Sequence, residues 1–150
     1  MEKGLYRNIL IATDGSESSR FAADSGIKLA RLSGAKIQAV YVINIYAYSS
    51  IPRDPVWSES MYTQFKELGR DAVSYIENMA KDEGVNVETR ILEGYPAEEI
   101  LNFAEEQDSD LIVLGSLGKT AIERFLIGSV SEKVVKNAKV SVLIVRPKSL

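Results

Sequence analysis

The 150-residue sequence contains no cysteine and no histidine. Their absence excludes disulfides, thiolate chemistry and zinc sites built from cysteine and histidine. A Ser-His-Asp triad and any imidazole general base are excluded as well. The chain also lacks an excess of positive charge, because 18 basic and 21 acidic residues give a net charge of −3. We therefore expect no partner among nucleic acids or anionic membrane surfaces.

Long hydrophobic runs are also missing. The charged start of the chain, residues 1–7, is followed only by a short apolar run over residues 9–12. Such a run is too short for the core of a signal peptide or for a membrane span. The absence of cysteine is compatible with a reducing compartment. We therefore expect a cytoplasmic protein that does not enter the membrane.

Length and composition are those of one soluble domain. Hydrophobic residues make up 45% and charged residues 26% of the chain, which is close to the average for globular domains. A chain of this length can bury roughly 70% of the surface that its unfolded form exposes. We expect residues 1–150 to form a single domain that needs neither disulfides nor a structural metal.

Short apolar runs alternate with longer amphipathic ones along the whole chain. The expected strands are residues 8–13, 36–42, 85–92, 111–114 and 140–145. The expected helices are residues 16–32, 58–83, 97–107 and 129–137. Loops are expected over residues 44–57 and, with or without a short helix, over residues 116–127. Strands that alternate with helices indicate an α/β fold with a parallel sheet.

The most uniformly apolar strands, residues 8–13 and 111–114, belong in the centre of the sheet. With right-handed crossovers, the five strands take the order 3-2-1-4-5, with helices on both faces of an open sheet. Ligands bind such sheets outside the carboxyl ends of the strands, where the strand order reverses. Here the reversal lies between the ends at Thr13-Asp14 and at Gly115–Gly118. The sequence therefore predicts a pocket between these two ends.

Glycines near this point have the spacing G-x2-G-x9-G-S, formed by Gly115, Gly118, Gly128 and Ser129. Glycine lets a ligand approach the bare backbone. The third glycine precedes an expected helix, whose first N–H groups and dipole favour an anion. A triphosphate could therefore lie between the two glycine clusters.

Side chains beside the glycines can add to such a site. The hydroxyls of Ser129 and Ser131 can donate hydrogen bonds to phosphate oxygens. Ser116 and Leu117 can line the site through their backbone, and Lys119 can neutralise phosphate charge. We include all five in the predicted site.

The glycine pattern and its surroundings resemble the universal stress protein family, in its ATP-binding branch. The matching stretches are Asn-Ile-Leu-Ile-Ala-Thr-Asp-Gly-Ser from residue 8, Asp-Leu-Ile-Val-Leu-Gly-Ser from residue 110, Gly-Ser-Val-Ser-Glu-Lys-Val-Val from residue 128 and Val-Leu-Ile-Val-Arg-Pro from residue 142. The resemblance covers essentially the whole chain except about residues 45–63, a segment that varies in the family.

The resemblance implies a Rossmann-like fold, similar to that of the adenine nucleotide alpha hydrolases, with ATP as the ligand. It implies that four residues enclose the adenosine: Ala12, Thr13, Asp14 and Val42. The glycine loop, with Gly128, Ser129 and Val130, would hold the ribose and the phosphates. The chemistry of triphosphates adds Mg²⁺ or Mn²⁺ as a companion ion. The last strand, Val140 to Val145, would pair with its copy in a homodimer.

Three functions remain open from the sequence. The first is a regulatory or sensor protein in the stress response, whose state depends on bound ATP and which is not an enzyme. The second is a slow ATP hydrolase, in which Asp14 or another carboxylate would have to act as the base because histidine is missing. The third is a homodimeric protein-interaction module with an unoccupied pocket.

Aromatic and apolar residues outside the glycine pattern are expected to have structural roles. Met61, Phe65 and Leu68 recur at helical spacing, so we expect them in the core or on a dimer surface. Tyr46, Tyr48 and Trp57 are expected to cover helix ends or contact a partner rather than stack on a base.

Overall fold

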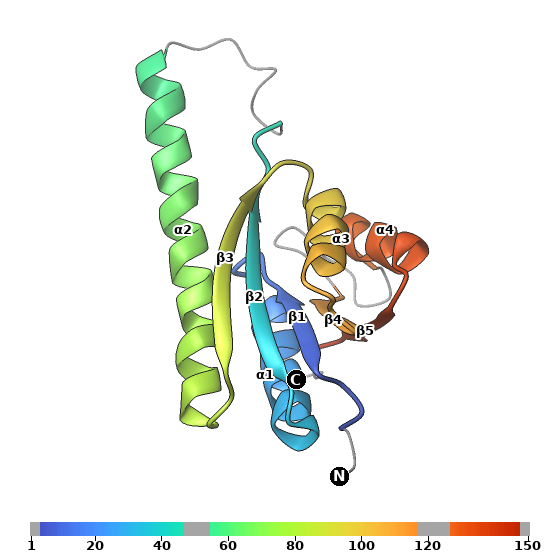
Figure 1. Cartoon of the computed structure of the whole chain (residues 1–150). Coiled ribbons are helices and arrows are strands. Elements are labelled where there is room, and N and C mark those ends of the chain that lie inside the picture. Colours follow the sequence, from blue (N-terminus) through green and yellow to red (C-terminus); the bar gives the residue numbers. More distant parts are fainter. Residues whose placement is uncertain (1–3, 47–54, 117–126, 148–150) are drawn as a thin grey trace.

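The structure, a computed structural model, describes residues 4–46, 55–116 and 127–147. Strands and helices alternate along these ranges (Figure 1). They are β1 (Asn8–Ala12), α1 (Glu17–Ser33), β2 (Lys36–Ile43), α2 (Pro55–Asp82), β3 (Val87–Glu93), α3 (Pro96–Glu106), β4 (Leu111–Gly115), α4 (Ser129–Asn137) and β5 (Ser141–Val145).

All strands belong to one parallel sheet with the order β3-β2-β1-β4-β5. The predicted order is therefore confirmed, including its reversal between β1 and β4. In the register of the sheet, Ile9 of β1 lies opposite Ile37 of β2 and Leu111 of β4. The carboxyl ends of the two central strands consequently emerge side by side.

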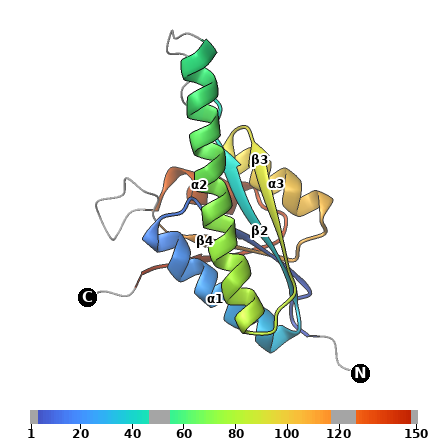
Figure 2. The ribbon, with the colours of Figure 1, turned by 90° about the vertical axis from the view of Figure 1, so that its left-hand side faces the viewer.

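The sheet separates two apolar cores, and β1 contributes to both. Ile9 and Ile11 pack with residues of α1 and α2 on one face. Leu10 and Ala12 pack with residues of α3 and α4 on the other face, as Figures 1 and 2 show for the helices. Ile9, Leu10 and Ile11 are completely buried, and burying each side chain contributes about 1.5–3 kcal/mol. This burial fixes the position of the strand end that leads into the predicted pocket.

The first helix has clear signals at both ends. Its N-cap, Ser16, accepts a hydrogen bond from the backbone N–H of Ser19. It ends at Gly34, whose φ of 72° is in the left-handed region that glycine adopts without strain. Both boundaries follow the sequence prediction to within one residue.

The second helix differs from the prediction. It begins at Pro55, three residues earlier than expected, with proline in the first turn, where its missing N–H is not needed. Of the two places expected for Leu68, the core and a dimer surface, its exposure of 47% excludes the core of this chain, whereas Ala72 and Ile76 are buried. The helix spans about 42 Å and the neighbouring β2 only about 26 Å. Its amino-terminal half therefore extends beyond the sheet (Figure 2).

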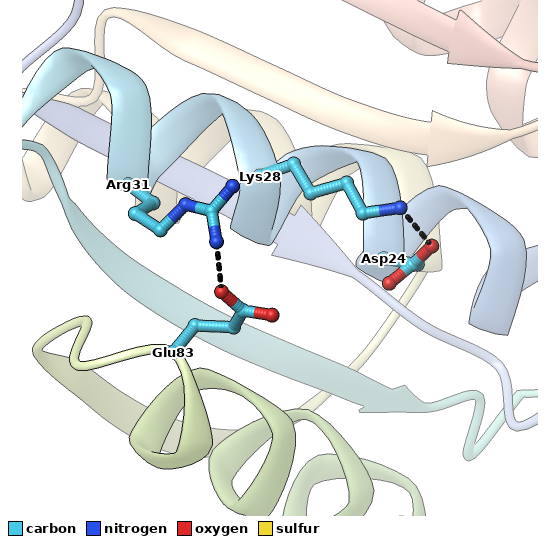
Figure 3. A network of polar contacts seen from close by, with 4 residues as sticks. All are labelled: Asp24, Lys28, Arg31 and Glu83. Atoms are coloured by element: carbon cyan, nitrogen blue, oxygen red, sulfur yellow. Dashed lines mark hydrogen bonds and ion pairs between the residues drawn. The ribbon is translucent and has the colours of Figure 1, made fainter.

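Charged side chains join α1 to the end of α2. Arg31 of α1 forms an ion pair with Glu83, directly after α2, and Lys28 pairs with Asp24 on the same face of α1 (Figure 3). All four side chains are at least one-third exposed, so each pair contributes at most about 1 kcal/mol. The packing of the two helices rests mainly on the apolar side chains beneath them.

The two edges of the sheet differ in character. Thr89 and Arg90 of β3, which point to opposite faces of the sheet, are both exposed. Four consecutive residues of β5, Val142 to Val145, are apolar and only partly buried.

In the part of the chain that the structure describes, no helix is long and apolar enough to cross a membrane.

Candidate functional site

The candidate site lies where β1 and β4 end. Ile11 and Val113 are paired across the two strands, so the loops that follow them leave the same edge of the sheet. The loop after β1 leads into α1, and the amino terminus of α4 lies beside the end of β4 (Figure 1). Among the described residues, the predicted positions after β1 and at the start of α4 therefore lie at the same edge of the sheet, where the strand order reverses.

Hydrogen bonds hold the loop after β1 in one conformation. The Thr13 hydroxyl accepts from the N–H of Gly15 at 3.0 Å and shares a 2.9 Å hydrogen bond with the Ser19 hydroxyl. One carboxylate oxygen of Asp14 accepts from the N–H of Ser16 at 2.9 Å. The Thr13 side chain is engaged inside the loop and only 8% of the residue is exposed, so its hydroxyl has a structural role in this loop.

The first turn of α4 is fixed to the end of β4. The Ser131 hydroxyl donates to the carbonyl oxygen of Gly115 at 2.8 Å. The N–H of Gly128 donates to the carbonyl oxygen of Ser116 at 2.8 Å. The Ser131 hydroxyl proton is thus committed to the protein, so this side chain stabilises the site rather than offering a donor to a phosphate.

The start of α4 leaves backbone donors without a partner inside the helix. Its first intrahelical hydrogen bond runs from the N–H of Glu132 to the carbonyl of Gly128 at 2.9 Å. The N–H groups of Ser129, Val130 and Ser131 precede it and have no acceptor within the helix. Together with the helix dipole, these three donors can bind an anion.

Two described glycines of the predicted pattern, Gly115 and Gly128, differ in whether the structure requires glycine at that position. A Cβ atom on Gly115 would lie 2.7 Å from the Ser18 hydroxyl oxygen and 3.0 Å from its backbone carbonyl, so this glycine permits close packing of α1 on β4. Gly128 has φ −61° and ψ 153°, which any residue can adopt. Its backbone conformation therefore does not require glycine.

Ser116 is the most deeply buried polar residue beside the site. It is completely buried, and its hydroxyl has no hydrogen-bond partner among the described residues. Buried hydroxyls normally have such a partner. Leu117, Gly118 and Lys119, which complete the predicted glycine loop, lie outside the described residues.

Two of the four residues predicted to enclose the adenosine, Ala12 and Val42, belong to the apolar cluster on the face of α3 and α4. Val130, predicted beside the ribose and the phosphates, packs against the same cluster from α4. Val42 and Val130 are only partly buried, so they retain accessible apolar surface. Residues from β1, β2 and α4 thus belong to one apolar cluster beside the amino terminus of α4.

Tyr41 is a residue near the site that the sequence analysis missed. It precedes Val42 on β2, so its side chain points to the opposite face, where it is 6% exposed. Burial raises the pKa of the Tyr41 phenol, and the negative charge of Asp14 raises it further. The sequence signal that could have found it is its place near the end of β2, next to the central strand.

Other features of the described residues do not add to this site. No group of three acidic side chains in residues 4–46, 55–116 and 127–147 is arranged to hold a metal ion. A groove of 590 Å³ lies between α1 and α2, lined by Arg20, Phe21 and Tyr75 among others. It contains none of the predicted site residues, so we do not assign the nucleotide to it.

Known proteins are similar to this chain in sequence and in structure. The model of the universal stress protein family matches residues 5–146. The universal stress protein MJ0531 of Methanocaldococcus jannaschii is 42% identical over 144 residues, which are 96% of this chain and 84% of that protein. The solved structure of the hypothetical protein MJ0577 has a TM-score of 0.84 at 29% identity and covers 97% of this chain and 99% of its own.

Two similar structures contain an adenine nucleotide. A universal stress protein in complex with cAMP has a TM-score of 0.65 at 29% identity, covering 94% of this chain and 97% of its own. The universal stress protein of Archaeoglobus fulgidus in complex with dAMP has a TM-score of 0.62 at 27% identity, covering 93% and 98%. With the family match over nearly the whole chain, these comparisons establish that the chain belongs to the universal stress protein family.

Proposed function

We propose that this chain binds ATP at the carboxyl edge between β1 and β4 and acts in the cytoplasm as a nucleotide-dependent regulatory protein. The observation that carries the proposal is the start of α4, where three N–H groups without an intrahelical acceptor stand beside the ends of the central strands. Two related structures with bound cAMP and dAMP support the choice of an adenine nucleotide.

Each group of residues has a distinct role in this proposal. The apolar surfaces of Ala12 and Val42 contact the adenosine. Asp14 keeps one carboxylate oxygen beyond its bond to Ser16, and this oxygen accepts from a ribose hydroxyl or from water on a bound Mg²⁺ or Mn²⁺. The backbone of Gly128 and Ser129 holds the phosphates.

The remaining members of the proposed site act around the phosphates. Val130 adds its backbone N–H, and Ser131 positions the first turn of α4 through Gly115. Ser116, Leu117 and Gly118 contribute backbone groups to the loop, and Lys119 contributes positive charge. The site is thus built for a ligand that is apolar at one end and anionic at the other.

Regulation requires that ATP bind two states of the protein with different affinity. A homodimer through β5 offers a second state, because this edge strand is apolar and only partly buried. In our proposal, ATP at the neighbouring β4 end changes the dimer or its partner affinity. The third function open from the sequence, an interaction module with an empty pocket, would retain the dimer without any dependence on ATP.

Direct calorimetric titration with ATP tests the proposal on the wild type and on Gly128→Val, with GTP as the control ligand. Valine can adopt the backbone conformation of Gly128, so the fold should be kept while the new side chain blocks the phosphates. We expect ATP to bind the wild type more tightly than GTP and to lose at least tenfold in affinity in the variant.

A wild type that is free of co-purified nucleotide and binds no ATP at millimolar concentration would overturn the proposal. If Gly128→Val bound ATP as tightly as the wild type, the ATP site would not lie at the start of α4. Phosphate release from ATP, compared between the wild type and Asp14→Asn, tests the alternative of a slow hydrolase. A turnover that disappears in Asp14→Asn would favour the hydrolase, whereas no turnover in either protein would favour binding alone.

A further inference from the structure

Two tyrosines stack on each other just beyond the carboxyl ends of β2 and β3. The ring centroids of Tyr46 and Tyr95 are 4.2 Å apart, and the ring planes differ by 14°. The two residues remain 47% and 51% exposed. An aromatic stack that is half open to solvent presents ring surface to a further planar group.

Backbone hydrogen bonds fix the position of this stack. The N–H of Gly94 donates to the carbonyl oxygen of Ile43 at 3.0 Å, which ties the segment before α3 to the end of β2. The N–H of Ile45 donates to the same carbonyl at 3.0 Å, so the chain turns back there. The N–H of Tyr46 donates to the side chain of Asn44 at 3.2 Å. The tyrosines are therefore held by the ends of two paired strands.

The stack lies at the rim of the face assigned above to the adenosine. Val42 pairs with Leu92 in the sheet, and both belong to the apolar cluster beneath α3 and α4. Tyr95 is the N-cap residue of α3, the helix that covers this cluster. Only three residues lie between Val42 and Tyr46, so their Cα atoms are at most about 14 Å apart.

We propose that the stack of Tyr46 and Tyr95 is the outer wall of the base subsite and holds a purine ring by stacking on it. This inference rests on the proposed function, because it needs the adenosine to lie against Val42. The apolar surface of Val42 would contact one side of the base and an exposed tyrosine ring the other. Stacking strength grows with ring area, so such a wall favours purine over pyrimidine nucleotides.

Calorimetric titration with ATP tests the wall on Tyr95→Ala and Tyr46→Ala, with Tyr95→Phe as the matched control. Base stacking on one aromatic ring corresponds to a change of about tenfold in Kd. We expect each alanine variant to bind ATP about tenfold more weakly and the phenylalanine variant to stay within about twofold of the wild type. Trp57→Ala, at an exposed aromatic residue in the first turn of α2, should not change the affinity.

A fluorescent base distinguishes stacking from a purely structural role. We would saturate each protein with the triphosphate of 2-aminopurine riboside, whose emission is quenched when the base stacks on an aromatic ring. The bound analogue should be quenched in the wild type and in Tyr95→Phe, and brighter in Tyr95→Ala. A structural role alone would lower Tm without changing the emission of the bound analogue.

The proposed wall would be overturned if both alanine variants fold, bind ATP as tightly as the wild type and quench the bound analogue fully. If the alanine variants do not fold, an unquenched analogue on the wild type would overturn it as well. A wild type that binds no ATP at all would instead overturn the proposed function and, with it, this inference. The two failures are therefore distinguishable in the wild type alone.

Discussion

The hydroxyl of Ser131 donates a 2.8 Å hydrogen bond to the carbonyl oxygen of Gly115 and so joins the first turn of α4 to the last residue of β4. Ser131 is only 6% exposed, so water has little access to its hydroxyl. The bond places the donors of α4 at the reversal point of the sheet. It is therefore a structural requirement of the candidate site.

Ser131→Ala should lower the free energy of unfolding by about 1–2 kcal/mol, because the partly buried carbonyl of Gly115 loses its donor. In a domain of this size, the loss corresponds to roughly 2–8 °C in Tm. Urea denaturation measures it. Ser129→Ala is the matched control, since Ser129 is exposed, and we expect its stability to stay within about 0.5 kcal/mol of the wild type. Equal effects of the two variants would contradict the role given to the bond.

Gly115→Ala should destabilise the protein more than Gly26→Ala. The new Cβ at position 115 would lie 3.0 Å from the backbone of Ser18, which cannot move without shifting α1. At position 26 it would meet the Cδ1 atom of Ile11, the far end of a flexible side chain. Overpacking costs about 1–3 kcal/mol, whereas alanine within a helix gains about 1 kcal/mol over glycine. Thermal unfolding of both variants would reveal the order, and the reverse order would count against the close packing.

Tyr41 should make the stability of the protein fall at alkaline pH. Burial, and next the charge of Asp14, raise the pKa of its phenol above the ordinary value of 10.0. A group with a raised pKa in the folded state stabilises fully below its unfolded pKa, and this contribution is lost as the pH rises through the folded pKa. The loss therefore begins near pH 10.

Urea denaturation of the wild type and of Tyr41→Phe between pH 8 and pH 11 isolates this contribution, because the lysines titrate in both proteins. We expect the wild type to lose more stability over this range than the variant. If the free energy of unfolding fell equally with pH in both proteins, Tyr41 would ionise as freely in the folded state as in the unfolded chain.

Ile144→Lys should weaken the proposed homodimer. Ile144 lies on the edge strand β5 and is partly buried in the single chain, so pairing with a second copy would bury it further. Sedimentation velocity over a range of protein concentrations should find dimers of the wild type and mainly monomers of the variant. Leu32→Lys, at a residue that is 79% exposed on α1, should leave the dimer unchanged. A wild type that is monomeric at all protein concentrations would contradict the proposed interface.

Much of the fold followed from sequence pattern because the central strands are almost purely apolar. Ile9 and Val113 could only be buried on both sides, and this placed the reversal of strand order correctly. The start of α2 could not be predicted as well, because Pro55 is compatible with a loop and with a first helical turn. Leu68 had the helical spacing of a core residue, but spacing does not reveal how far the sheet beneath a helix extends.

The candidate site was predictable in its position and less so in its roles. The spacing of Gly115 in the sequence predicted contact with a ligand. The structure shows that glycine is also needed there for packing against Ser18, almost a hundred residues away in sequence. The commitment of the Ser131 hydroxyl to a carbonyl is likewise a tertiary contact. Tyr41 escaped notice because its electrostatic partner, Asp14, lies on another strand end. Local patterns carry no information about such contacts between distant segments.

The length of α2 gives the molecule a part that can open by itself. All buried residues of this helix lie from Gly69 onward. Its first fourteen residues, Pro55 to Leu68, contact the core only through partly buried side chains, among them Tyr62 and Phe65. A helix of that length is marginal in water without packing. Amide hydrogens of Pro55 to Leu68 should exchange with solvent through local unfolding. Those after Gly69 should exchange only when the whole domain unfolds. The helix is thus continuous in shape but divided into two units of unequal stability.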